Sequence, residues 1–199
     1  MAVSGGVQSR RLGFTVLLVA GVAPVAVAVG MAVTDPQPAL RHPAITITAH
    51  AFVAFWAVAA GLQLRARSVE WTVLSPRLRL ARWAWTIGLV VHLVHVGFAF
   101  GLGHEWSHAA AVRHVEKVGG FGEGIVVNYL FAGVWAADVV WWWVSPGRYA
   151  HRPGWVGYAV HGFLAFMVFN ATVIFGSGPV RVAGVVAFAV LAGLLWARR

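Results

Sequence analysis

The feature that most constrains this chain is a series of six apolar stretches separated by short polar breaks. A membrane-spanning helix needs about 20 mostly apolar residues. The six stretches reach or approach that length at residues 12–33, 44–64, 83–103, 124–144, 155–176 and 179–196. We therefore predict an all-α, polytopic transmembrane bundle of six spanning helices, which forms one integral membrane domain over residues 1–199.

The composition of the chain supports this prediction. Of its residues 60% are hydrophobic and 11% are charged, whereas a soluble domain carries roughly 45–50% apolar and about 25% charged residues. A chain of 199 residues cannot hide this excess in a water-soluble core, because a folded monomer must cover its surface with polar groups. The partner that the composition indicates is a lipid bilayer.

The distribution of basic residues predicts the orientation of the bundle. Eleven of the 15 Lys and Arg residues lie on one set of sides of the stretches: Arg10, Arg11, Arg65, Arg67, Arg77, Arg79, Arg82, Arg148, Arg152, Arg198 and Arg199. The other four are Arg41, Arg113, Lys117 and Arg181. Because basic residues accumulate on the cytoplasmic side, we predict cytoplasmic N and C termini in an inner (cytoplasmic) membrane. The net charge of +9 then reflects topology and head-group contacts, and we expect no nucleic-acid partner.

The first stretch has a second interpretation. Ser9-Arg10-Arg11 precedes the apolar run, and Ala26-Val27-Ala28 lies near its end. This pattern also occurs in export signals, including twin-arginine signals. If the segment is cleaved, five helices remain and their orientation is unchanged.

Several polar side chains lie inside the outer half of the predicted bundle. Such groups are functional-site candidates, because a bilayer makes them costly to bury. At 1.5 Å per residue, His50 and His95 have nearly the same depth, and His92 shares a helix face with His95. Asn128 and Asn170 bring supporting polar groups from two other helices. We expect the imidazoles to face the interior of the bundle.

A second pairing is predicted in the inner half. Asp138 and His161 lie on the two arms of an antiparallel hairpin, at the same depth. A carboxylate beside an imidazole can orient the ring and stabilise its charged form. The pair indicates a buried contact that fixes the hairpin, a proton-transfer step, or a carboxylate that orients a metal-binding histidine.

A histidine-rich segment follows the third stretch, and we predict an outer-surface helix there at residues 104–117. His104 and His108 are spaced i, i+4, so a helix would present both imidazoles to one Zn, Cu or Fe ion. His114 or a neighbouring Glu provides a third ligand. The string His104-Glu105-Trp106-Ser107-His108 has the H-E-x-x-H pattern. It resembles gluzincin-type metalloproteases over these five residues alone, and the resemblance implies metal-assisted hydrolysis with Glu105 in the site.

These residues leave several functions open. The first is a metal or haem protein in a redox role, in which b-type haem lies between His50 and His95, or between His92 and His161, or in which a non-haem ion binds the outer histidines. The second is a non-catalytic subunit or assembly factor, with a membrane-protein partner or as a homo-oligomer, whose polar groups only join helices. The third is a proton or metal-ion transporter. Membrane-embedded hydrolysis is the fourth.

Missing residue types and motifs exclude other chemistries. The chain has no cysteine, which excludes disulfides, iron–sulfur clusters and thiolate metal sites. A bound metal would therefore be held by His, Asp and Glu. Phosphate loops, dinucleotide fingerprints and G-x-S-x-G elbows are absent from the sequence, so kinase, dehydrogenase and serine-esterase functions have no support.

Overall fold

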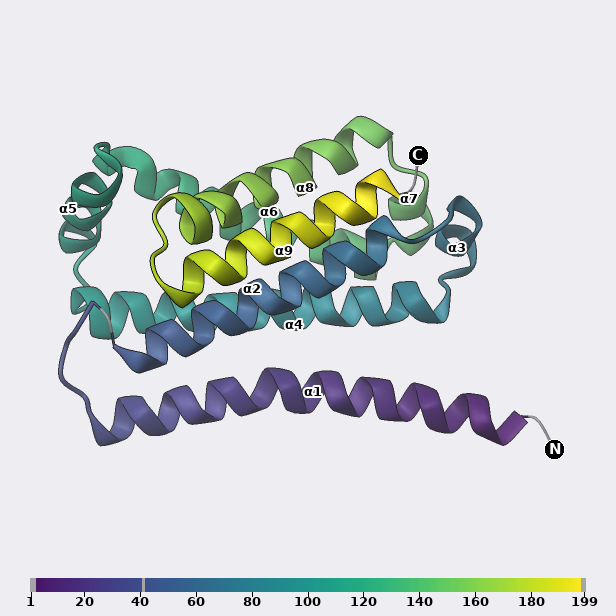
Figure 1. The fold of residues 1–199 in the computed structure, drawn as a ribbon, viewed down its shortest axis with the longest axis horizontal. Helices are drawn as coiled ribbons and strands as arrows, with labels where there is room; N and C mark the ends of the chain where they lie inside the picture. Colours follow the sequence, from purple (N-terminus) through teal and green to yellow (C-terminus); the bar gives the residue numbers. More distant parts are fainter. Residues whose placement is uncertain (1–2, 41, 198–199) are drawn as a thin grey trace.

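The structure is a computed structural model that describes the backbone of residues 3–40 and 42–197 and, in the first helix, the side chains from Gly13 onward. Long helices run back and forth along the longest axis of the molecule, which is horizontal in Figure 1. They are α1 (Val3–Thr34), α2 (Pro43–Leu64), α4 (Pro76–Phe98), α6 (Ile125–Val144), α8 (Gly154–Phe169) and α9 (Pro179–Trp196). The shorter helical elements are α3 (Ser68–Val73), η1 (Ala99–Gly103), α5 (His108–Gly119), η2 (Gly122–Gly124), α7 (Pro146–Ala150) and η3 (Asn170–Ile174). No strand occurs within these described ranges.

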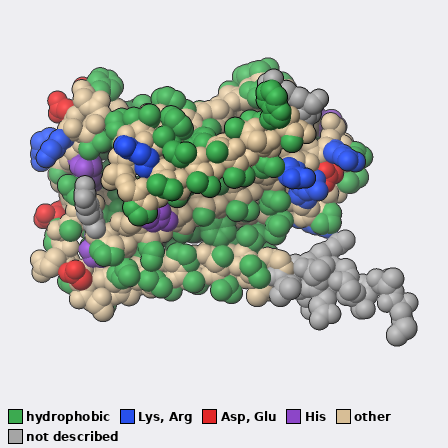
Figure 2. All heavy atoms as spheres, in the orientation of Figure 1, with side chains coloured by type: hydrophobic (Ala, Val, Ile, Leu, Met, Phe, Trp, Pro, Cys, Tyr) green, Lys and Arg blue, Asp and Glu red, His purple; other side chains and the backbone are tan. Residues whose placement is uncertain are grey.

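Six helical stretches in the described part of the chain are long and apolar enough to cross a membrane. They are Gly13–Thr34, Pro43–Leu64, Pro76–Gly103, Gly122–Val144, Gly154–Ile174 and Pro179–Trp196. Apolar side chains cover the middle of the face in Figure 2, and charged side chains gather toward its two ends. Hydrocarbon matches this middle band, because helices satisfy their backbone hydrogen bonds internally. The prediction of an all-α chain with six helices able to span a membrane is confirmed.

Several helix boundaries differ from the sequence prediction, and helix α1 begins at Val3 rather than at residue 12. Helix α4 begins at Pro76 rather than at residue 83, because the Ser75 hydroxyl accepts the Leu78 N–H at 3.3 Å and proline occupies the first helical position. The outer-surface helix begins at His108 rather than at residue 104. Glu105 and Trp106 have left-handed backbone angles, φ 50° and 59°, and these angles interrupt a right-handed helix.

The centre of the bundle is formed by α4 packed between α2 and α6. Trp85 and Trp135 are fully buried there, with ring centroids 5.1 Å apart. The close approach depends on Gly88, where an added Cβ would lie 3.0 Å from the Trp135 ring and 3.1 Å from the Cβ of Phe55. Helix α1 lies at the edge of the bundle beside α2 and α4 (Figure 1), and only 11% of its apolar span is buried.

The connections divide between the two ends of the bundle. Helices α3 and α7 lie at one end, near the C-terminus, and α5 lies at the other (Figure 1). Arg65 to Arg82 and Arg148 to Arg152 belong to the α3 end, while Arg113 and Lys117 are on α5. Arg181 lies at the start of α9. The other basic residues that support the orientation lie outside the described side chains: Arg10, Arg11, Arg41, Arg198 and Arg199.

The short connection before α4 is fixed by one carboxylate. Glu70 of α3 accepts the Arg67 N–H at 2.8 Å, the Ser75 hydroxyl at 3.1 Å and an Arg77 N–H at 3.1 Å. The backbone hydrogen bond from Arg67 is the main cause that lowers the pKa of Glu70. The same residue thus caps α3 and joins it to the first turn of α4.

Single-cysteine labelling tests the predicted orientation, because the chain has no cysteine of its own. Ser68→Cys on α3 and Val118→Cys on α5 place thiols at exposed positions at opposite ends without changing a charge. In intact spheroplasts, a membrane-impermeant maleimide should label V118C and not S68C, since we expect the α3 end to be cytoplasmic. Both variants should react after lysis. Labelling of S68C alone would reverse the orientation, and equal labelling of both would contradict opposite sides.

Candidate ligand-binding cavity

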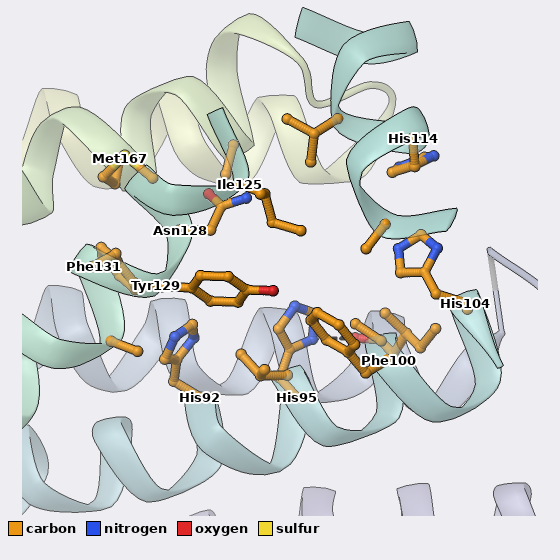
Figure 3. Close-up of a pocket in the computed structure, with 18 of the residues that line it drawn as sticks. His92, His95, Phe100, His104, His114, Ile125, Asn128, Tyr129, Phe131 and Met167 are labelled. Atoms are coloured by element: carbon orange, nitrogen blue, oxygen red, sulfur yellow. Dashed lines mark hydrogen bonds between the residues drawn. The ribbon is translucent and has the colours of Figure 1, made fainter. Parts of the chain in front are cut away.

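A cavity of about 360 Å³ lies between α4, α5, α6 and α8, toward the α5 end of the bundle (Figure 3). Its volume is near the lower end of the range for small-molecule sites, about 300–1,000 Å³. Most of its wall is apolar and includes Phe100, Phe131 and Met167. The polar side chains that line it are His92, His95, His104, His114, Asn128 and Tyr129.

Two π-helical turns shape this cavity. The turn η1 continues α4 and contributes Phe100 and Gly103, while η3 continues α8 and contributes Ala171. Single π-helical turns are rare and occur frequently at functional sites. From His92 to His104 the wall follows α4 and η1 for about 18 Å at 1.5 Å per residue. The cavity therefore extends from the interior of the bundle to its α5 end.

His92 lies at the deep end of the cavity and is 6% exposed. Its ring packs against Phe52 and Phe131 with centroid distances of 4.9 and 4.8 Å, and stacks on Trp135 at 5.8 Å. Neither ring nitrogen has a hydrogen-bond partner among the described residues. A buried polar group left unpaired costs about 1–3 kcal/mol. His92 thus brings unused hydrogen-bonding capacity to the cavity wall.

His95 is held in one tautomer by helix α2. Its Nδ1 lies 3.1 Å from the carbonyl oxygen of Ile45 and 3.3 Å from the hydroxyl of Thr48. A carbonyl oxygen only accepts, so Nδ1 carries the proton and donates to Ile45. The other nitrogen, Nε2, is then an unprotonated acceptor on the opposite side of the ring. Both His95 and Phe100 line the cavity (Figure 3).

Of the other polar residues predicted for the outer half, one lines the cavity and two do not. Asn128 lines the cavity, whereas the Asn170 side chain donates to the carbonyl of Phe166 in its own helix at 2.8 Å. His50 is exposed, so the expectation that it faces His95 is wrong. Because Thr48 contacts His95 and a helix turns about 200° over two residues, His50 points to the opposite side of α2.

A buried polar cluster occupies the α7 end of the bundle. Asp138 is 3% exposed and accepts hydrogen bonds from Trp85 Nε1 at 3.0 Å, Tyr149 at 2.9 Å and Arg152 at 3.1 Å. Arg152 also donates to His161 Nε2 at 3.3 Å, and burial raises the pKa of the Tyr149 phenol. Asp138 and His161 are therefore joined through Arg152.

Sequence reasoning missed Arg152 as a member of this cluster, because Arg152 was counted only as a topology determinant. Its guanidinium lies between the two residues that were predicted as a direct pair, and it also lies over the Tyr149 ring at 3.8 Å. The available signal was position: Arg152 comes two residues before α8, at the mouth of the hairpin that carries Asp138 and His161. Since guanidinium only donates, His161 Nε2 is occupied as an acceptor.

The histidines near α5 form a different pair from the one predicted. His104 and His114 lie with ring centroids 5.3 Å apart, while His108 Nδ1 lies 2.9 Å from the Tyr129 hydroxyl. The left-handed turn at Glu105 removes the helical i, i+4 geometry that the H-E-x-x-H pattern requires. Burial, and then the neighbouring His114, lowers the pKa of His104. Within residues 3–40 and 42–197, no group of three or more His, Asp or Glu side chains is arranged to hold a metal ion.

Comparison with known proteins assigns no function to this cavity. No family model, curated protein or solved structure matches the chain. The chemistry of the site is therefore the basis for a function. It offers an apolar chamber with imidazole nitrogens at its deep end, an amide and a phenol in its wall, and two histidines near α5. Such a chamber suits a ligand with few polar atoms.

The Asp138 cluster makes a prediction about stability. Arg152→Leu leaves the buried carboxylate without its positive partner, which costs about 3–5 kcal/mol for a buried pair. Thermal unfolding in detergent should therefore occur at a clearly lower temperature than for the parent chain. The double variant Asp138→Leu with Arg152→Leu should recover part of the loss, since neither charge remains. Arg148→Leu, an exposed arginine of α7, is the matched control, and equal transitions for R152L and R148L would contradict the prediction.

Proposed function

We propose that this multi-pass membrane protein binds a small, planar, mostly apolar molecule that carries hydroxyl or carbonyl oxygens, as a phenol or a quinone does. The site is the cavity between α4, α5, α6 and α8. The observation that carries the proposal is His92, which lines this cavity, is buried, and has two unpaired ring nitrogens. Both nitrogens are enclosed by neighbouring side chains, so a ligand oxygen would satisfy one of them after a small shift of that packing.

The two deep histidines suit a neutral oxygen ligand. A neutral imidazole has one donor and one acceptor, and His92 has both free. His95 donates its only proton to Ile45, so its Nε2 can accept from a ligand hydroxyl. The surrounding Phe100 and Phe131 favour a flat ring, and an apolar wall disfavours a charged ligand, because burying a charge without a partner is costly.

The alternative functions account less well for these contacts. A purely structural histidine would join two helices, but among the described residues His92 makes no hydrogen bond. A proton relay needs hydrogen-bonding groups in series. Between His92 and His161, however, the contacts run through the rings of Trp135 and Trp85, with centroid distances of 5.8, 5.1 and 5.2 Å. Ligand binding explains the unpaired His92 more directly than either role.

A b-type haem in a redox role is the second candidate. His92 of α4 and Met167 of α8 both line the cavity from different helices (Figure 3), and His with Met is a known axial pair for haem. The pairs predicted from the sequence support this less, since His50 is exposed and His161 accepts from Arg152. In this second candidate, His92 and Met167 would be the axial ligands.

The proposal places the protein in the cytoplasmic membrane with both termini inside the cell. The basic residues of the α3 and α7 connections support this orientation. The cavity then opens toward the outer face, where α5 lies. A ligand that partitions into the outer half of the bilayer would reach the site without crossing the membrane.

The test replaces His92 with phenylalanine, a ring of similar shape without polar atoms. The probes are 2-methyl-1,4-naphthoquinone and its reduced diol, titrated calorimetrically into the detergent-purified protein. Loss of a hydrogen bond of about 1 kcal/mol should weaken binding about fivefold in H92F. In the absence of probe, H92F should unfold at the same or a higher temperature than the parent chain, because the variant buries no unpaired nitrogen.

The exposed His50→Phe variant is the control and should match the parent chain in both measurements. If neither probe binds the parent chain, or if H92F binds equally well, the phenol or quinone proposal is wrong. A lower unfolding temperature for unliganded H92F would instead show that His92 supports the fold. The absorption spectrum of the same sample tests the haem candidate, which requires a Soret band that H92F diminishes.

A further inference from the structure

The chain turns sharply between η1 and α5, and this turn brings together His104 and His114, which are ten residues apart in the sequence. Glu105 and Trp106 hold left-handed angles, which cost non-glycine residues about 1–3 kcal/mol each and cluster at functional sites. The turn is closed by hydrogen bonds from Trp106 N to the Phe100 carbonyl at 2.7 Å and from Ser107 N to the His104 carbonyl at 2.8 Å. Helix α5 then lines the cavity and places its His114 beside His104.

The separation of His104 and His114 fits one shared metal ion. Their ring centroids are 5.3 Å apart and the rings are tilted by 51°. Two imidazoles that bind one tetrahedral ion, with metal–nitrogen distances of about 2.0–2.1 Å, have centroids about 5 Å apart. Both side chains line the cavity, and Figure 3 shows them near each other, away from His92.

We propose that His104 and His114 bind one divalent transition-metal ion, such as Zn²⁺, at the end of the cavity next to α5. Two protein ligands leave two of the four tetrahedral positions of Zn²⁺ open for water or another ligand, whereas catalytic zinc sites combine three protein ligands with one open position. The proposal rests on the turn and the histidine pair, and it is independent of a ligand at His92. It also differs from the H-E-x-x-H pairing, because His108 contacts Tyr129 instead.

The lowered pKa of His104 favours metal binding. A histidine binds a metal through a neutral imidazole, so protonation competes with the ion. Partial burial and the neighbouring His114 lower the pKa of His104. A lowered pKa shifts the His104 ring toward the neutral form, which is the form that binds a metal.

Zinc titration by calorimetry tests the site in the full-length chain, purified in detergent through a tag without histidines. The parent chain should bind about one Zn²⁺ at this pair. His104→Gln and His114→Gln keep a polar side chain but remove an imidazole ligand. Each should weaken zinc binding about tenfold or more, which corresponds to about 1.4 kcal/mol.

His108→Gln is the matched control, because His108 lies in the same helix as His114 and forms part of the sequence motif. H108Q should bind zinc as the parent chain does. Absence of zinc binding in the parent chain, or equal affinity in the parent chain, H104Q and H114Q, would overturn the pair. Loss of zinc binding in H108Q together with normal zinc binding in H114Q would also overturn the pair. If H114Q fails to fold, H104Q provides the test, because residue 104 lies in the connection between η1 and α5 and not within a helix. The zinc and quinone titrations use different residues, so each proposal can fail alone.

Discussion

The structure depends on one constraint: a polar group that is surrounded by hydrocarbon and packed helices must find a partner. Asp138 meets this constraint with three donors from Trp85, Tyr149 and Arg152. His95 meets it through the Ile45 carbonyl. His92 is among the exceptions: both of its ring nitrogens lack a partner among the described residues, as do side-chain atoms of Trp56, Gln63, Arg82 and Trp135. Of these groups, His92 lines the cavity, and the proposed ligand site rests on it.

Much of the fold could be predicted from the sequence, because a run of apolar residues fixes a spanning helix by length alone. The limits of the last helix, 179–196, agree with those of α9. The earlier start of α4 was also predictable in principle, since Ser75-Pro76 is a helix-start signal. The candidate site was predicted less completely. Residue number gives the depth of a side chain along a helix, but its direction depends on which face of the helix packs against a neighbour. For this reason His50 and His95 have similar depths, yet His50 does not face His95.

The H-E-x-x-H string shows why a short motif is weak evidence for a site. Its geometry exists only if the five residues are helical, and backbone angles at Glu105 and Trp106 decide that. Nothing in these two residue types signals a left-handed turn, since neither is glycine or asparagine. The same turn creates the His104 and His114 pair, which no regular spacing would indicate. Likewise, Arg152 was visible as a charge but not as the group between Asp138 and His161.

The packed rings of Trp85 and Trp135 have a consequence for permeation. They are fully buried and lie in contact between the cavity wall at His92 and the polar cluster around Asp138. A membrane protein with polar groups toward both ends risks conducting water or ions between them. Two indole rings form an apolar barrier between these two polar regions, and water does not hydrate such a barrier favourably.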